Sequence, residues 1–232
     1  MKNNKNGFTL VEILVALAIG TLMLMAIYSA VNSAQQSSTG IERKVTAQQD
    51  ARSVLELMAM EIRMASYNPN LTPNIWLSTA NCFSVATNQN YRGIQEATAT
   101  SLTIEMDIDD SASVGDHENE IIRYNYNTDN EYITRSTNCG ANEPFLGATI
   151  ANEANKTVLV VNDAVGVPVF RYYNGSGTEI TAPVTTSIPD IRRVEITLVL
   201  DTVYSGPGAS GRKRMIYSTS VIPRNHIPTY SY

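Results

Sequence analysis

Residues 7–31, GFTLVEILVALAIGTLMLMAIYSAV, decide how this chain is built. From Phe8 to Val31 the sequence contains one carboxylate, Glu12, and no proline. A helix rises about 1.5 Å per residue, so this stretch spans roughly 36 Å, which is enough to cross the hydrocarbon core of a bilayer. We therefore expect residues 8–31 to form a transmembrane segment.

The flanks of this segment set its orientation and distinguish it from other membrane signals. Lys2 and Lys5 precede it and should hold the N-terminus in the cytoplasm, so that the rest of the chain is exported. A secretory signal has a shorter apolar region followed by a small-residue cleavage site, whereas the candidate processing residue here, Gly7, comes first. A simple single-pass anchor explains the length but not Glu12, because a carboxylate in hydrocarbon is costly unless it is partnered. Cleavage after Gly7 would create such a partner, a free amino group at Phe8 of a neighbouring chain.

The hexapeptide GFTLVE (Gly7 to Glu12), after a lysine-containing leader and before an apolar helix, resembles the class III signal of type IV pilins and type II secretion pseudopilins. In that family a prepilin peptidase cuts after the glycine and N-methylates the new first residue. The resemblance implies that residues 1–7 are a cleaved leader peptide and that Phe8 is methylated. It also implies that Glu12 pairs with the Phe8 amine of an adjacent subunit during assembly.

Helical periodicity continues beyond the membrane, to about Tyr67. After a polar segment, apolar or small residues recur at steps of three and four, and Asn68-Pro69-Asn70 ends the element. The recurring positions are Ile41, Val45, Gln48, Ala51, Leu55, Met58, Ile62 and Ala65. Charged residues, Glu61 among them, are assigned to the other faces. Residues 32–67 are thus expected to be an amphipathic half-helix whose stripe is buried against the rest of the chain.

After Pro73 the pattern changes to short strands with turn residues, which predicts an exported β-rich domain over residues 68–232. The expected strands are 82–87, 101–107, 120–126, 131–136, 157–161, 167–173, 193–200 and 214–222. Within 193–200, every second residue from Val194 to Leu200 is apolar, which is typical of a sheet with one buried face. The expected fold class is α+β and pilin-like, with a long N-terminal helix packed on an antiparallel sheet domain.

Two further stretches narrow the resemblance. Residues Gln49 to Tyr67, and the closing strands Ile191–Asp201 and Tyr217–Asn225, are similar to PilW-type minor pilins and to the related J-type pseudopilins. The resemblance implies a structural component of the initiation or tip complex of a type IV pilus. The alternatives are a J-type pseudopilin of a type II secretion pseudopilus, and a tip adhesin or other binding module.

The resemblance also implies partners and a location. The partners are the prepilin peptidase, other minor pilins, the major pilin and the bacterial inner membrane. The protein would span that membrane once, with a periplasmic C-terminal domain, and then enter a pilus or pseudopilus. A formal charge of −5 argues against a nucleic-acid partner.

The sequence offers little catalytic chemistry, and no enzyme is expected. There is no glycine-rich phosphate loop after a strand. The histidines His117 and His226 lie neither in a zinc-ligand spacing nor beside an evident nucleophile.

Two other sites are considered in the exported domain. Cys82 and Cys139 are expected to form a disulfide, because paired cysteines in an oxidising compartment usually bridge. In the acidic segment 107–120, a calcium-loop spacing would place ligands at Asp107, Asp109 and Glu118. Ala112 stands where that loop requires glycine, so a solvated acidic loop is the favoured interpretation and calcium the alternative. No other cofactor is expected.

Overall fold

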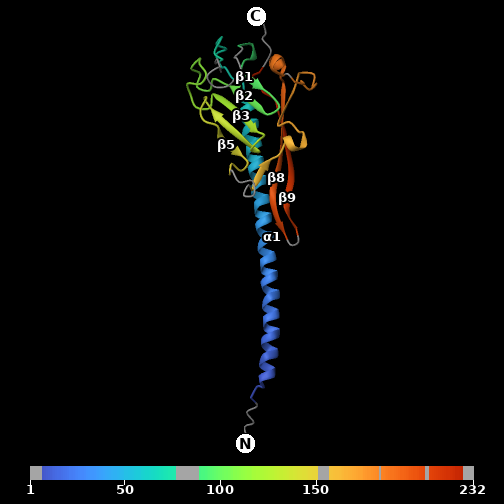
Figure 1. Cartoon of the computed structure of the whole chain (residues 1–232). Helices are drawn as coiled ribbons and strands as arrows, with labels where there is room; N and C mark the ends of the chain where they lie inside the picture. Colours follow the sequence, from blue (N-terminus) through green and yellow to red (C-terminus); the bar gives the residue numbers. More distant parts are fainter. Residues whose placement is uncertain (1–6, 77–88, 151–156, 183, 207–208, 227–232) are drawn as a thin grey trace.

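A computed structural model of the chain describes residues 7–76, 89–150, 157–182, 184–206 and 209–226. In these residues one long helix, α1 (Leu10–Met64), projects from a head made of two antiparallel sheets (Figure 1). The N-terminal end of α1 points away from the head. The predicted α+β, pilin-like fold is confirmed.

Helix α1 is uninterrupted over its 55 residues, because no proline occurs before Pro69. It ends at Met64, three residues before the predicted end. Ser66 adopts a left-handed conformation (φ 65°), and its N–H donates to the Glu105 carbonyl at 2.9 Å. The chain therefore leaves the helix to join the end of a strand.

The first sheet is a five-stranded antiparallel meander in the order β1-β2-β3-β4-β5. Its strands are β1 (Ile94–Ala97), β2 (Ser101–Glu105), β3 (Ile121–Asn127), β4 (Tyr132–Thr137) and β5 (Glu143–Leu146). Strands β3 and β4, expected at 120–126 and 131–136, form a hairpin, and the Glu131 N–H donates to the Asn127 carbonyl across its turn at 2.9 Å. The edge strands β1 and β5 were not predicted.

The second sheet is built around one long strand. Its members are β6 (Val158–Val160), β7 (Phe170–Tyr173), β8 (Arg193–Gly206) and β9 (Ala209–Val221). Strand β9 pairs with one edge of β8 along its whole length, and β6 and β7 share the other edge. The β8–β9 hairpin runs along α1 toward the N-terminus, below the level of the first sheet (Figure 1).

The core lies between α1 and the two sheets. Buried residues of α1 meet the predicted inner face of β8 in one cluster, which includes Ala51, Leu55, Met58, Ile62, Val194, Ile196, Leu198 and Leu200. Two stripe predictions were wrong. Ile41 and Val45 are 57% and 45% exposed, and the buried positions at helical spacing begin at Ala47. Glu61, predicted to face solvent, is buried in the head.

Candidate functional site

The first turn of α1 contains an intramolecular cap. Thr9 is the N-cap residue, and its hydroxyl accepts a hydrogen bond from the Glu12 N–H at 3.3 Å. In return, the Glu12 carboxylate accepts the Thr9 N–H at 2.8 Å and the Thr9 hydroxyl at 2.9 Å. This reciprocal arrangement is a capping box, which satisfies backbone donors that the helix leaves unpaired. The carboxylate of Glu12 is therefore held at the entry of the apolar helix.

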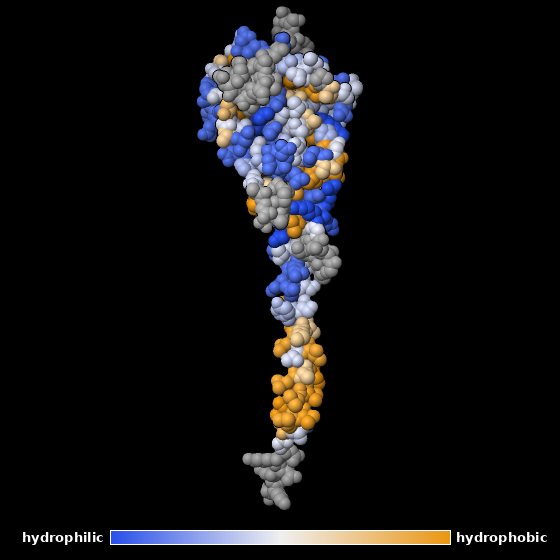
Figure 2. Space-filling view, in the orientation of Figure 1, coloured by the Kyte–Doolittle hydropathy of each residue, from blue (hydrophilic) through white to orange (hydrophobic). Residues whose placement is uncertain are grey.

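Beyond this cap the helix is bare. Large apolar side chains from Leu10 to Val31 are at least half exposed, and none of them contacts the head. Figure 2 shows this part of the helix as one hydrophobic band, which a more polar stretch separates from the head. Among the described residues, α1 is the one helix long and apolar enough to cross a membrane. Water does not favour such a surface, so lipid or other subunits must cover it.

One side of this bare helix is hollowed. The hollow is lined by residues from Phe8 to Leu24, including Glu12, Ala16 and Gly20. Ala16 and Gly20 are four residues apart, the small-xxx-small spacing that lets two membrane helices approach closely. Nothing lies within 4 Å of the position that a Gly20 Cβ would take. The hollow therefore has room for a neighbouring helix beside the Glu12 carboxylate.

Comparison with known families decides what this N-terminus is. Residues 2–28 match the prokaryotic N-terminal methylation motif. The N-terminus is therefore of the prepilin type, as in type IV pilins and pseudopilins. Proteins of this class are structural subunits and not enzymes, and their motif implies processing by prepilin peptidase and assembly with other pilins. No curated protein and no solved structure matches the chain.

The predicted processing residues precede the capped turn. Gly7 and Phe8 lie before the helix in extended or irregular backbone, and Phe8 is 85% exposed. A peptide bond in such a segment is open to a peptidase. Cleavage after Gly7, methylation of Phe8 and the assembly role of Glu12 remain predictions.

The head contains buried polar clusters that sequence reasoning missed. In the first, the Glu61 carboxylate of α1 accepts hydrogen bonds from the Tyr124 hydroxyl and from Arg135 Nη2, the latter at 2.7 Å. Burial and the Glu61 charge raise the pKa of Tyr124 well above its usual range. Burial alone would lower the pKa of Arg135, but Glu61 outweighs it and raises that pKa. The cluster thus holds α1 to the first sheet.

A second cluster lies within the first sheet, between β1 and β3. Glu96 accepts Arg123 Nε at 2.8 Å and the hydroxyls of Ser101 and Thr103 at 2.7 and 2.8 Å. Burial would raise the pKa of Glu96, but these hydrogen bonds together lower it. The Glu96 carboxylate is therefore ionised, and its hydrogen bonds help to hold the strands of the first sheet together.

A buried serine–histidine pair joins the C-terminal segment to the end of α1. His226 Nδ1 lies 2.8 Å from Ser66 Oγ, and Nε2 donates to the Ile188 carbonyl at 2.9 Å. The Ser66 hydroxyl can then donate to Nδ1, and Ser66 Oγ accepts the Gly93 N–H at 3.1 Å. His226 is only 2% exposed, and Nε2 meets a carbonyl where a catalytic triad has a carboxylate. The pair ties chain segments together and leaves no room for a substrate.

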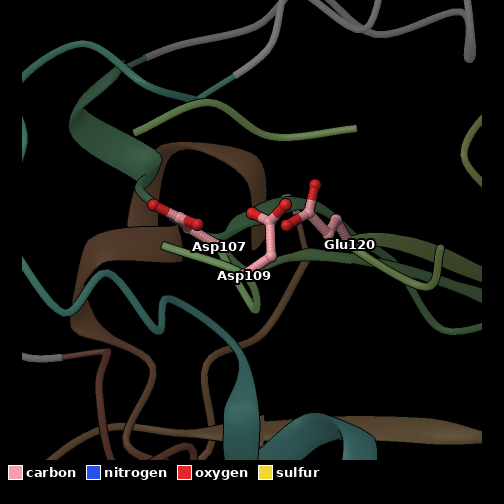
Figure 3. A group of neighbouring side chains, drawn as sticks. All are labelled: Asp107, Asp109 and Glu120. Carbon is pink, nitrogen blue, oxygen red and sulfur yellow. The ribbon is translucent and has the colours of Figure 1, made fainter. Parts of the chain in front are cut away.

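The acidic segment between β2 and β3 gathers three carboxylates (Figure 3). Asp107, Asp109 and Glu120 each place one oxygen within 4.8 Å of the others, and those of Asp109 and Glu120 face each other. Glu118, the third ligand of the calcium alternative, is exposed and is not part of this group, in which Glu120 takes its place. The calcium-loop spacing failed because it applies to a loop between helices, whereas this loop joins two strands.

Backbone amides already occupy the carboxylates of this acidic loop. Glu120 accepts the N–H groups of Ile108, Gly115 and His117 at 2.8–3.1 Å. Asp107 accepts those of Ser111 and Ala112, both at 3.1 Å. Each carboxylate therefore organises the loop around itself, as Asp side chains commonly do in turns. This arrangement gives Asp107 and Glu120 a role in the structure of the loop itself.

The cysteine prediction falls partly outside the described residues. Cys139 lies in the turn after β4, at the surface, and is not a free cysteine. Its expected partner, Cys82, lies in the segment 77–88, outside the described residues. The Cys82–Cys139 pairing therefore stays a prediction.

Proposed function

We propose that this protein is a minor pilin of the PilW type, which acts in the initiation or tip complex of a type IV pilus. The observation that carries the proposal is Glu12, a carboxylate at the start of a bare apolar helix that supports a two-sheet head. The stretches 49–67, 191–201 and 217–225 support the PilW assignment by their resemblance to that type.

The proposed mechanism follows from the order of features along the chain. The precursor inserts with Lys2 and Lys5 in the cytoplasm and residues 68–232 in the periplasm. Removal of residues 1–7 frees the Phe8 amine, which is then methylated. Glu12 attracts the amine of an adjacent subunit, since an ion pair offsets the cost of each charge in lipid. Residues 8–31 then leave the bilayer as part of a helix bundle.

N-terminal analysis of the protein from membranes tests the first step. The expected mature chain begins with N-methylated Phe8, and a chain that still begins with Met1 would contradict the proposal. Deletion of the gene then separates the two filament systems. Loss of surface pili with normal exoprotein export is expected for a minor pilin. Loss of export with normal pili would assign the chain to a J-type pseudopilin.

A further inference from the structure

We infer that the end of the β8–β9 hairpin nearest the membrane, with Arg212, Lys213 and Arg214 of β9, is a docking surface for anionic phospholipid head groups. The inference goes beyond the proposed function, because it holds for either filament system and requires only that residues 8–31 span a bilayer. The contact holds one side of the head against the surface of that bilayer.

The hairpin is the part of the head that comes closest to the membrane segment. Strands β8 and β9 both pack against α1. In Figure 1 their hairpin extends along the helix toward its N-terminal end, beyond the first sheet. Gly40 is the first buried residue of α1, so the head reaches the helix to within nine residues of Val31, or about 14 Å.

Positive charge is concentrated at this end of β9. Arg212 lies only three residue pairs from the last pair of the hairpin. Arg212, Lys213 and Arg214 are all exposed. Asp201 on β8 accepts Arg214 Nε and Nη2, each at 2.9 Å, and offsets one of the three charges. The end of the hairpin is therefore cationic, on a chain whose formal charge is −5.

Protection of a sheet edge does not explain this distribution. Strand β9 pairs with β8 on one side, and none of the described strands pairs with its other side. Charged side chains commonly guard such an edge against pairing with another chain. Residues 215–221, the rest of the same edge, contain no charged residue. The charges therefore mark one end of the strand, the end that faces the bilayer.

Two further cations lie on α1 at the same end of the head. Arg43 and Lys44 are exposed, and they follow the buried Gly40 by three and four residues. Residues at these spacings are neighbours along one side of a helix, so both cations flank the stripe that the head covers. Glu42 is adjacent in sequence and offsets one of these two charges.

The distance to the bilayer surface suits long basic side chains. With Val31 at the edge of the hydrocarbon, a head-group layer about 5–7 Å thick follows. The level of Gly40 then lies within about one Debye length, roughly 8–10 Å, of the head groups. Transmembrane helices tilt by about 20° on average, and a tilt toward the hairpin brings its end closer still. Arginine and lysine can then place their charges among the lipid phosphates while their stems stay outside the bilayer.

Photocrosslinking of the full-length protein in vesicles tests this contact. A photoreactive residue at Gly211 removes no charge, and nothing lies within 4 Å of the position that a Cβ would take there. Ile216, which is 64% exposed on the same strand, is the matched position about 17 Å farther from the turn. The vesicles contain phosphatidylcholine alone or with about 30% phosphatidylglycerol as the anionic lipid. Phospholipid adducts at position 211 should increase about tenfold with phosphatidylglycerol, and those at 216 should not.

Two triple variants with the same change in charge isolate the docking surface. The first combines Arg212→Gln, Lys213→Gln and Arg214→Gln. The second neutralises three exposed cations elsewhere, by Arg52→Gln, Arg63→Gln and Arg224→Gln. The first should reduce adducts at position 211 to the level in phosphatidylcholine alone, and the second should leave them unchanged. Salt at about 1 M, where the Debye length is about 3 Å, should abolish the difference between the two lipids.

Equal adduct formation at position 211 in the two lipids, or an equal loss in the two triple variants, would overturn the inference. In native membranes, adducts from position 211 with a protein and none with phospholipid would overturn it too, because the occupant would then be a protein. All of these outcomes leave the proposed function standing, since that function is tested by N-terminal processing and by filament assembly.

Discussion

Glu61 on α1 and Arg135 on β4 form an ion pair at 2.7 Å, although 74 residues separate them in the sequence. Both lie in the head, where Glu61 is almost fully buried and Arg135 keeps one edge in solvent. Arg135 also donates to the Asn119 side chain at 2.9 Å. Helix α1 is thereby joined to the first sheet by an ion pair as well as by apolar packing.

Replacement of Glu61 by alanine should destabilise the head by about 3 kcal/mol, because a guanidinium and the Tyr124 hydroxyl lose their buried acceptor. The measurement is the chemical denaturation of the full-length protein in detergent. Glu56→Ala, on the exposed face of the same helix, is the matched control and should change stability by less than about 0.5 kcal/mol. Equal effects of the two variants would contradict a structural role for the ion pair.

Acid should weaken the head through His226. Burial lowers the pKa of His226 to about 4, against a usual value near 6.5. The unfolded chain therefore takes up a proton at a higher pH than the folded chain, and stability falls as the pH drops from about 6.5 to 4. Because a single proton is involved, the free energy of unfolding should change by at most about 1.4 kcal/mol per pH unit.

Denaturation of the His226→Gln variant, measured across the same pH range, isolates this effect. Glutamine does not titrate and can still donate to the Ile188 carbonyl. The difference in free energy of unfolding between the unmodified protein and the variant should therefore shrink as the pH falls toward 4. Parallel curves for the two proteins would show that His226 does not control the acid response.

The sequence predicted the parts of this protein whose pattern is local. The 3.6-residue period gave α1, and the alternation from Val194 to Leu200 gave the inner face of β8. Glu61 was wrongly predicted to face solvent, because a charged residue in a helix is usually exposed. Its partners Tyr124 and Arg135 come from distant strands, so the local sequence pattern does not indicate them. Strand β5 was missed because four residues with a proline carry no alternation. Such a strand forms only because β4 offers it an edge.

The assembly role of Glu12 can be separated from its capping role. Glu12→Ala should leave membrane insertion and cleavage intact but reduce the recovery of the protein in sheared filaments. Thr9→Ala also removes the capping box, at a cost of about 1 kcal/mol of helix stability, but keeps the carboxylate. Recovery of the Thr9 variant should stay near that of the unmodified chain. A similar loss in both variants would assign Glu12 to the cap and not to assembly.

The predicted disulfide should join Cys82 to Cys139 in the exported protein. Mass spectrometry of peptides from the non-reduced chain measures this directly, and two free thiols would rule the bridge out. The bridge would close a loop of 56 intervening residues. By the chain-entropy model, its loss in the Cys139→Ser variant should cost about 4 kcal/mol.

Calcium should not stabilise the head, because backbone N–H groups already occupy the carboxylates of Asp107 and Glu120. The thermal midpoint of the full-length protein is expected to be the same with millimolar calcium and with chelator. Glu120→Gln weakens three hydrogen bonds to the loop backbone and should lower the midpoint in both conditions, whereas Glu118→Gln, at an exposed position, should not. A midpoint that rises with calcium in the unmodified chain, and no longer rises in Glu120→Gln, would instead make these carboxylates a metal site.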